Sequence, residues 1–237
     1  MIDFLDPNKL DDTLADSVKD LGELAAVEGK LAELRQQFAA LPEDAGEFER
    51  SELTLEIARA LQLLGKNGEA WPLARGTVDS FIQAEAWEQA ADACNILYQT
   101  SEPGFLSALG QGIWLGVTYP IDPELSIELL SHVVDDTPDN SDGAAVAAAS
   151  ASFIADVRTQ EGAERERMQF FTQQLLGKVA RRHSDVNNEQ QFKYWIEKME
   201  LDQPDKFLVR LRNIVDVLVQ EDWWFDREAL QSRIPEA

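Results

Sequence analysis

The sequence predicts an all-α protein of about ten helices, arranged as stacked antiparallel helix pairs or as an irregular helical bundle. Apolar residues recur three and four positions apart through nearly every segment, which is the period of a helix buried on one side. Strict alternation of apolar and polar residues, which indicates a strand, never lasts beyond a few positions. The hydrophobic content of 44% is close to that of ordinary globular proteins, so the chain has enough apolar residues for a core.

Five helices are expected in the first half of the chain. Asp11 or Asp12 can cap the first, and Pro42 interrupts it. Ser51 is the expected N-cap of the second, which ends near Gly65. The third and fourth carry apolar residues at helical spacing, and a proline–glycine pair opens the fifth. These helices are expected over about residues 12–40, 51–64, 69–83, 87–99 and 104–117.

The second half continues the helical pattern after a short turn. Pro123 suits the first turn of a sixth helix, whereas the aspartate-rich residues 135–143 predict a loop. An alanine-rich helix over residues 144–158 would let its neighbours approach closely, so we expect it and the glycine-rich fifth helix to be interior. Further helices are expected over about residues 162–183, 188–200, 205–220 and 226–233.

Two short motifs resemble the tetratricopeptide repeat family. In Gly65-Lys-Asn-Gly-Glu-Ala70 an alanine follows a glycine by five residues, and in Trp87-Glu-Gln-Ala90 an aromatic residue precedes an alanine by three. In that family the small residues allow the two helices of a repeat to pack closely. The resemblance covers about residues 51–135 and implies a concave surface that binds proteins or peptides.

The charge of the chain is strongly acidic and unevenly distributed. The sequence has 44 Asp and Glu against 21 Lys and Arg, a net charge of −23. Residues 76–157 contain 13 acidic residues and no lysine or arginine. Residues 1–160 have a net charge of −20, and residues 161–237 have −3. This difference predicts an acidic helical-repeat-like region over 1–160 and a C-terminal helical region over 161–237 packed on it, as a separate unit or within one continuous domain.

Composition excludes several functional classes. The acidic excess disfavours binding to nucleic acid and to anionic membranes, because both need Lys and Arg. Residues 1–12 lack the basic and apolar stretches of a signal peptide. A single cysteine, Cys94, cannot form an internal disulfide, which suits a reducing compartment. We therefore expect a cytoplasmic protein whose partner is basic.

The side chains that usually perform catalysis or bind metals are too few for a site. Glu128 and His132 lie four apart on one expected helix, but a metal site needs more ligands than these. The loop of residues 135–143 has Asn140 where a calcium loop needs glycine. Cys94 is expected to be buried and unreactive. The sequence therefore predicts a protein that is not an enzyme, with no catalytic residues, no metal and no cofactor.

Two groups of residues are candidates for partner binding. Carboxylates of the acidic stretch can form one field if equivalent helix faces align, although a general solubility coat or an adaptation to high salt would look similar. Three consecutive aromatic residues near the C-terminus either clamp the last helix to the body or anchor a partner. The basic cluster Lys178, Arg181 and Arg182 can be ordinary exposed charge or can pair with the acidic surface, within one molecule or between two. The candidate residues are Asp79, Glu85, Glu88, Asp92, Glu102, Glu124, Glu128, Asp135, Asp136, Trp223, Trp224 and Phe225.

The function predicted from these features is that of a non-enzymatic adaptor or an assembly chaperone. Its acidic helical surface would hold a protein partner that is basic or partly unfolded. Two alternatives stay open, namely a structural subunit of a stable multiprotein complex and an acidic nucleic-acid mimic that inhibits a DNA-binding protein. The sequence does not determine the oligomeric state.

Overall fold

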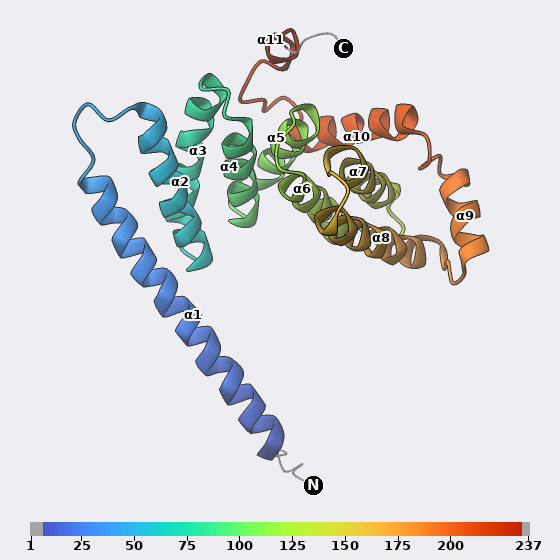
Figure 1. The fold of residues 1–237 in the computed structure, drawn as a ribbon, viewed down its shortest axis with the longest axis horizontal. Helices are drawn as coiled ribbons and strands as arrows, with labels where there is room; N and C mark the ends of the chain where they lie inside the picture. The colour runs from blue at the N-terminus through green and yellow to red at the C-terminus, as the bar shows by residue number, and fades with distance from the viewer. Residues whose placement is uncertain (1–6, 234–237) are drawn as a thin grey trace.

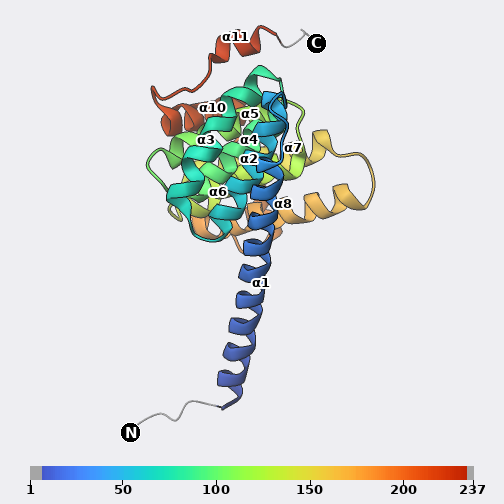
Figure 2. The same ribbon diagram turned by 90° about the vertical axis from the view of Figure 1, so that its left-hand side faces the viewer.

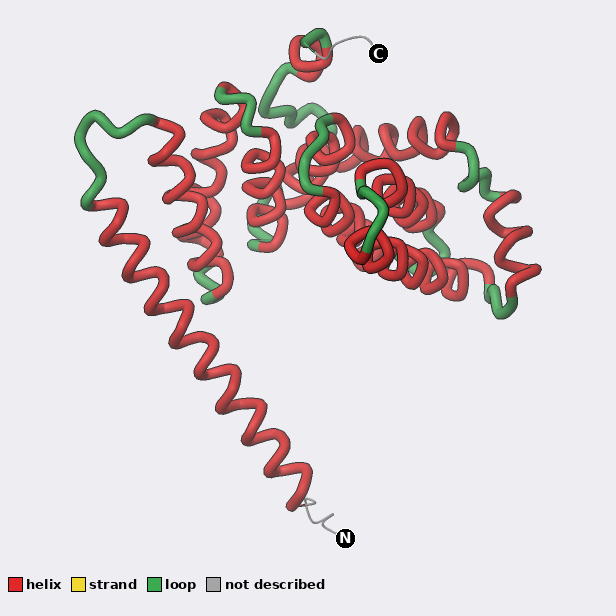
Figure 3. Tube along the Cα trace, viewed as in Figure 1, coloured by secondary structure: helices red, strands yellow, loops and turns green. Residues whose placement is uncertain are grey.

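The structure, a computed structural model, describes the backbone of residues 7–233 and the side chains of residues 22–233. Residues 7–233 contain eleven helices and no strand, which confirms the predicted all-α fold class, and short loops join most of the helices (Figure 3). The helices are α1 (Pro7–Ala39), α2 (Glu47–Leu63), α3 (Asn67–Gln83), α4 (Trp87–Gln99), α5 (Phe105–Thr118), α6 (Pro123–Asp136), α7 (Asp142–Arg158), α8 (Ala163–Ser184), α9 (Glu189–Lys198), α10 (Pro204–Val219) and α11 (Arg227–Gln231).

Helices that follow one another in the sequence also pack against one another in space, from α1 to α9 (Figure 1). The even-numbered helices α2, α4, α6 and α8 contact one another in the same order. α10 returns along the stack and packs on α5 and α7, so it closes the side away from the even-numbered row. The arrangement is that of a helical repeat, with adjacent pairs stacked side by side.

Buried positions recur every 36 residues through α2, α4 and α6. This spacing is regular enough for corresponding turns of the three helices to face the same core. The three helices therefore present equivalent faces inward, and their opposite faces are equivalent as well. The buried sets are Leu55, Ala91 and Ile127, then Ala58, Cys94 and Leu130, and finally Leu61, Leu97 and Val133.

The alanine-rich helix α7 lies among α6, α8 and α10. Its buried residues are mostly alanines, which have no side-chain atoms beyond Cβ and so let three helices come close. Gly110 has the same role where α5 meets α10, because a Cβ atom there would lie 2.6 Å from Val219 Cγ2. These contacts confirm that the alanine-rich and glycine-rich helices are interior.

α1 is attached to the stack through its C-terminal part. Leu31 and Leu34 are buried in a small core with Ile57 and Leu61 of α2. Farther toward its N-terminus the helix extends away from the body (Figure 2), and Leu24 is already 43% exposed.

Ser51 is not a helix N-cap, which corrects the boundary expected from the sequence. α2 begins earlier, at Glu47, and Ser51 is buried within it. The side chain of Arg50 donates a hydrogen bond to the carbonyl of Pro42 at 2.7 Å, which fixes the turn before the helix, and acidic residues then fill a first turn that favours negative charge. α1 likewise begins at Pro7, before the expected aspartate cap. The other helices begin and end within a few residues of the expected positions.

Candidate functional site

A stripe of carboxylates crosses α2, α4 and α6 at the same 36-residue spacing as the buried positions. Each helix carries two of them, four residues apart, and residues at this spacing project from one side of a helix. The carboxylates therefore share one surface, on the row of even-numbered helices. We name this surface the acidic face, and it consists of Glu52 and Glu56 on α2, Glu88 and Asp92 on α4, and Glu124 and Glu128 on α6.

Equivalent side-chain contacts connect successive helices across the acidic face. Arg59 of α2 forms an ion pair with Asp92 of α4. Asn95, which is 36 residues beyond Arg59, donates a hydrogen bond from Nδ2 to Glu128 Oε1 of α6 at 3.1 Å. The second contact repeats the first, but a neutral amide replaces the cation. Glu128 therefore has no cationic partner among the described residues.

The negative potential of the acidic face accumulates from one helix to the next. Burial raises the pKa of the Asp92 carboxyl, whose side chain is only 22% exposed, and Arg59 partly offsets this effect. Glu56 on one side and Glu128 on the other raise the pKa of Asp92 further, because like charges disfavour ionisation. A cation brought to this surface would relieve that repulsion.

An open cavity of about 230 Å³ lies between α4 and α6. Glu88, Asp92 and Asp122 line it together with Leu125. Glu88 Oε2 accepts a hydrogen bond from the backbone N–H of Asp122 at 3.1 Å, which holds one wall in place. Three carboxylates around one small cavity make it suitable for a cationic side chain.

Several predicted carboxylates form ion pairs within the molecule. Lys178 of the basic cluster is one of the cations, and Arg182 donates a hydrogen bond to the Val134 carbonyl at 2.6 Å. The basic cluster therefore contacts the acidic segment of its own chain. The pairs are Asp79 with Arg75, Glu85 with Arg233, Asp92 with Arg59, Glu124 with Arg167 and Asp135 with Lys178.

The structure brings together only part of the predicted carboxylate set. Asp79 and Glu85 lie on and just after α3, and Glu102 is half-buried in the turn after α4. Asp136, at the end of α6, accepts a hydrogen bond from the hydroxyl of Tyr98. None of these four belongs to the acidic face, whereas Glu88, Asp92, Glu124 and Glu128 do.

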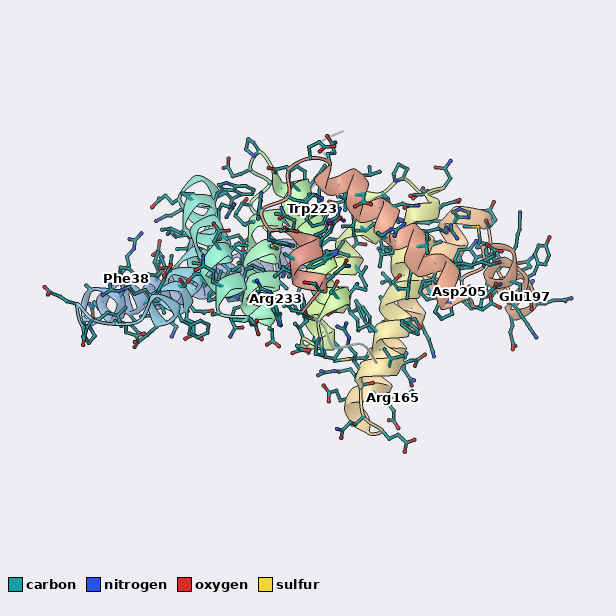
Figure 4. All side chains as sticks on the ribbon, turned by 90° about the horizontal axis from the view of Figure 1, so that it is seen from above. Phe38, Arg165, Glu197, Asp205, Trp223 and Arg233 are labelled. Atoms are coloured by element: carbon teal, nitrogen blue, oxygen red, sulfur yellow. The ribbon has the colours of Figure 1, made fainter. Side chains whose placement is uncertain are left out.

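The C-terminal aromatic residues pack back on the body of the protein. Trp223, Trp224 and Phe225 follow α10 in an irregular segment and are each half-buried, and Figure 4 shows Trp223 over the central part of the molecule. The rings of Trp223 and Phe225 lie 6.2 and 5.3 Å from that of Trp114 in α5, between centroids. The guanidinium of Arg75 lies 4.3 Å from the centroid of the Trp224 ring. Of the two arrangements that the sequence allows, these residues therefore have the one in which they pack against the body of the protein.

Two groups that could suggest catalysis have structural explanations. Cys94 is buried, and burial raises the pKa of its thiol to about 12, so the reactive thiolate is not formed at neutral pH. His183 lies 2.7 Å from Ser184 Oγ through Nδ1 and 2.9 Å from Asp142 Oδ1 through Nε2, which resembles a hydrolase triad. However, the indole N–H of Trp195 also donates to Nδ1, at 3.3 Å, and competes for the lone pair that a general base needs. We interpret this group as a junction of α7, α8 and α9.

Among the described side chains, no group of three or more His, Cys, Asp or Glu is placed to hold a metal ion. No helix between residues 7 and 233 combines the length and the apolar character that crossing a bilayer requires.

Sequence reasoning missed the part of the acidic face that lies outside residues 76–157, the stretch without lysine or arginine. Glu52 and Glu56 precede residue 76, so a search for a stretch without cations does not find them. The apolar residues Met168 and Phe171, which line a groove beside the acidic face, were missed as well. Comparing the chain with itself at a shift of 36 residues is the signal that would have shown the carboxylate stripe.

No protein-family model, curated protein or solved structure matches this chain.

Proposed function

We propose that this protein is a non-enzymatic adaptor or assembly chaperone whose acidic face holds a basic segment of a partner protein. The recurrence of two carboxylates on each of α2, α4 and α6 is the observation that supports the proposal most directly. A general solubility coat has no reason to repeat at the interval of the helix pairs. We also propose that the pairs are tetratricopeptide-like, since their 36-residue interval is close to the ~34 residues of that family.

The cations already on the acidic face are weak competitors for a partner. Arg167 and Glu124 form an ion pair at 3.3 Å in which both side chains are about two-thirds exposed. Exposed pairs of this kind contribute about 0–1 kcal/mol, so an incoming lysine or arginine can replace them at little cost. Electrostatic attraction would also accelerate the encounter with a basic partner.

Neutralising the exposed row of the acidic face tests the proposal. The triple variant Glu52→Gln, Glu88→Gln and Glu124→Gln is compared with Glu189→Gln, Glu197→Gln and Glu228→Gln, which changes the net charge equally on exposed positions of α9 and α11. A partner captured from native extract is purified, and its affinity is measured between about 0.05 and 0.5 M salt. We expect wild type and control to lose affinity strongly with salt, and the acidic-face variant to bind weakly throughout. Equal effects of the two variants, or an affinity that salt leaves unchanged, would contradict the proposal.

A structural subunit of a stable complex is the second candidate, because α1 extends away from the body (Figure 2). A permanent subunit would co-purify with its complex in fixed stoichiometry, whereas an adaptor or chaperone would be recovered largely free. Size-exclusion chromatography of the protein at its natural abundance separates these outcomes.

A further inference from the structure

The groove between α6 and α8 contains an apolar cavity that no part of the described chain fills. Both helices pack on α7 and touch each other only slightly, which leaves space between them. Ile127, Met168 and Phe171 line a cavity of about 310 Å³ there. A second cavity of about 390 Å³ shares Ser131 and Phe171 with the first, so the groove continues along both helices.

Phe171 is far more exposed than its apolar neighbours, and a bound partner would cover it. Its side chain is 50% exposed although it lies beside the nearly buried Ile127 and Met168, each 4% exposed. An aromatic ring at the mouth of an apolar cavity gains free energy when another apolar group covers it. The cavity volume is at the lower end of the range of ~300–1,000 Å³ found for ligand sites, which suits one or two side chains.

Charge determines which kind of segment can bring an apolar side chain here. Glu124 and Glu128 of the acidic face line the same cavity, and Glu128 has no cationic partner among the described residues. The opposite wall, on α8, carries three cations, namely Arg167, which is paired with Glu124, Lys178, which is paired with Asp135, and Arg181. A segment entering the groove therefore meets negative charge on its α6 side and positive charge on its α8 side, so its own cations must lie toward α6 and the acidic face.

We propose that the α6–α8 groove binds a leucine-sized or aromatic side chain of a basic segment whose lysine or arginine residues lie on the acidic face. The inference rests on the proposed function and identifies the chemistry of the partner segment. Packed helices lie ~8–10 Å apart, and an extended chain advances ~3.3 Å per residue. A cation at the α4–α6 cavity is therefore about three residues from the apolar side chain in the groove.

Three synthetic 12-residue peptides test the inference directly. The first has lysines on both sides of a central leucine, the second replaces that leucine by serine, and the third keeps the leucine and replaces each lysine by glutamine. The protein is labelled at its methionine methyl groups, since Met168 lines the groove and Met199 lies outside it. We expect the first peptide to bind about tenfold more tightly than either of the others, because a leucine side chain gains this much or more on burial. We also expect it to shift the Met168 resonance and not that of Met199.

A pair of adjacent phenylalanines supplies the matched variants. Phe171→Ala should weaken binding of the first peptide about tenfold, whereas Phe170→Ala should leave it unchanged, since Phe170 is 66% exposed and does not line either cavity. Both side chains are at least half exposed, so neither change should unfold the protein.

The possible results separate the groove from the acidic face. Equal affinity for the leucine and serine peptides, with no shift at Met168, would overturn the groove and leave the acidic face standing. Equal affinity for the lysine and glutamine peptides would overturn the basic character of the segment. Failure of both lysine peptides to bind would overturn the proposed function together with the groove.

Discussion

Gln111 of α5 holds the C-terminal segment through the backbone of Trp224. Its Oε1 accepts a hydrogen bond from the Trp224 N–H at 2.9 Å, and its Nε2 lies 3.4 Å from the Asp222 carbonyl oxygen. The Gln111 side chain is completely buried, so these contacts form where water does not compete. One amide in the centre of the stack therefore positions residues that are more than one hundred positions later in the chain.

Gln111→Leu should release this segment. The substitution leaves the Trp224 N–H without its acceptor and leaves the Asp222 carbonyl with Ser107 Oγ alone, at 3.3 Å, which costs about 1–3 kcal/mol of the free energy of unfolding. Urea denaturation followed by tryptophan fluorescence measures the loss, and hydrogen exchange at residues 222–225 should become faster. The control is Gln173→Leu at an exposed position of α8. Similar losses in both variants would show that the contact with Trp224 contributes nothing.

Arg158→Met should destabilise the end of α5. The Arg158 guanidinium donates hydrogen bonds to the carbonyl oxygens of Gly116 and Val117 at 2.5 and 2.8 Å, in place of the helical partners these groups lack. Removing a charged donor from half-buried acceptors costs about 2–3 kcal/mol. Arg158→Lys should recover only part of this, because one ammonium cannot reproduce the two-pronged geometry. Thermal and urea unfolding give the values, and the exposed Arg181→Met serves as a reference that should change little.

Two glycines in helices should respond in opposite directions to alanine. At Gly110 a Cβ atom would lie 2.6 Å from Val219 Cγ2 and 2.9 Å from Leu218 Cβ, so Gly110→Ala must push α5 and α10 apart and should cost about 2 kcal/mol or more. At Gly76 nothing lies within 4 Å of the position that a Cβ atom would take, so Gly76→Ala should stabilise α3 by about 0.5–1 kcal/mol. The denaturation midpoints of the two variants test the close contact between α5 and α10 at Gly110. An unchanged midpoint for Gly110→Ala would contradict this contact.

His132 should make the protein less stable as the pH falls below neutrality. Burial lowers the pKa of His132, although Glu128, Asp136 and Asp135 oppose this by favouring the charged ring. Its Nε2 lies 2.9 Å from Asn95 Oδ1 and donates a hydrogen bond to it in either protonation state, so burial decides the direction of the shift. The unfolded chain takes up a proton near pH ~6.5, before the folded chain does, so stability is lost as the pH decreases through that value.

The size of this effect is limited by the single proton involved. The slope that His132 adds cannot exceed about 1.4 kcal/mol per pH unit. Urea denaturation of wild type and His132→Gln between pH 7 and 5 isolates it, and the variant should show the flatter dependence. If NMR gave His132 the ordinary pKa of histidine, or if the variant lost stability more steeply as the pH decreases, the prediction would be contradicted.

Local sequence signals predicted the helices well because they act within a few residues. Pro123 begins α6, as its fixed φ suggested, and Asp122 caps that helix by accepting a hydrogen bond from the Glu124 N–H at 2.8 Å. Ser51 failed as a cap because Arg50 reaches back to the preceding turn and stabilises an earlier start. A hydrogen bond from a residue within the helix back to the preceding turn is not visible in a local cap motif.

The candidate site depended on contacts that sequence spacing does not specify. Glu124 pairs with Arg167, and Asp135 pairs with Lys178, each across 43 residues. Which carboxylates stay without a cation therefore depends on how α8 lies beside α6. The three aromatic residues could be predicted not to share one helix face, but not to follow α10 in an irregular segment that reaches Trp114.

Several carboxylates of the acidic segment form ion pairs with cations that are translated after them. Residues 1–160 have a net charge of −20, and the cations that pair with Glu124, Asp135 and Glu85 all come later in the chain. A nascent chain on the ribosome therefore exposes the acidic helices before Arg167, Lys178 and Arg233 have been translated. α10, which covers α5 and α7, is also made late. Self-repulsion among the acidic helices is therefore offset less in the growing chain than in the folded protein.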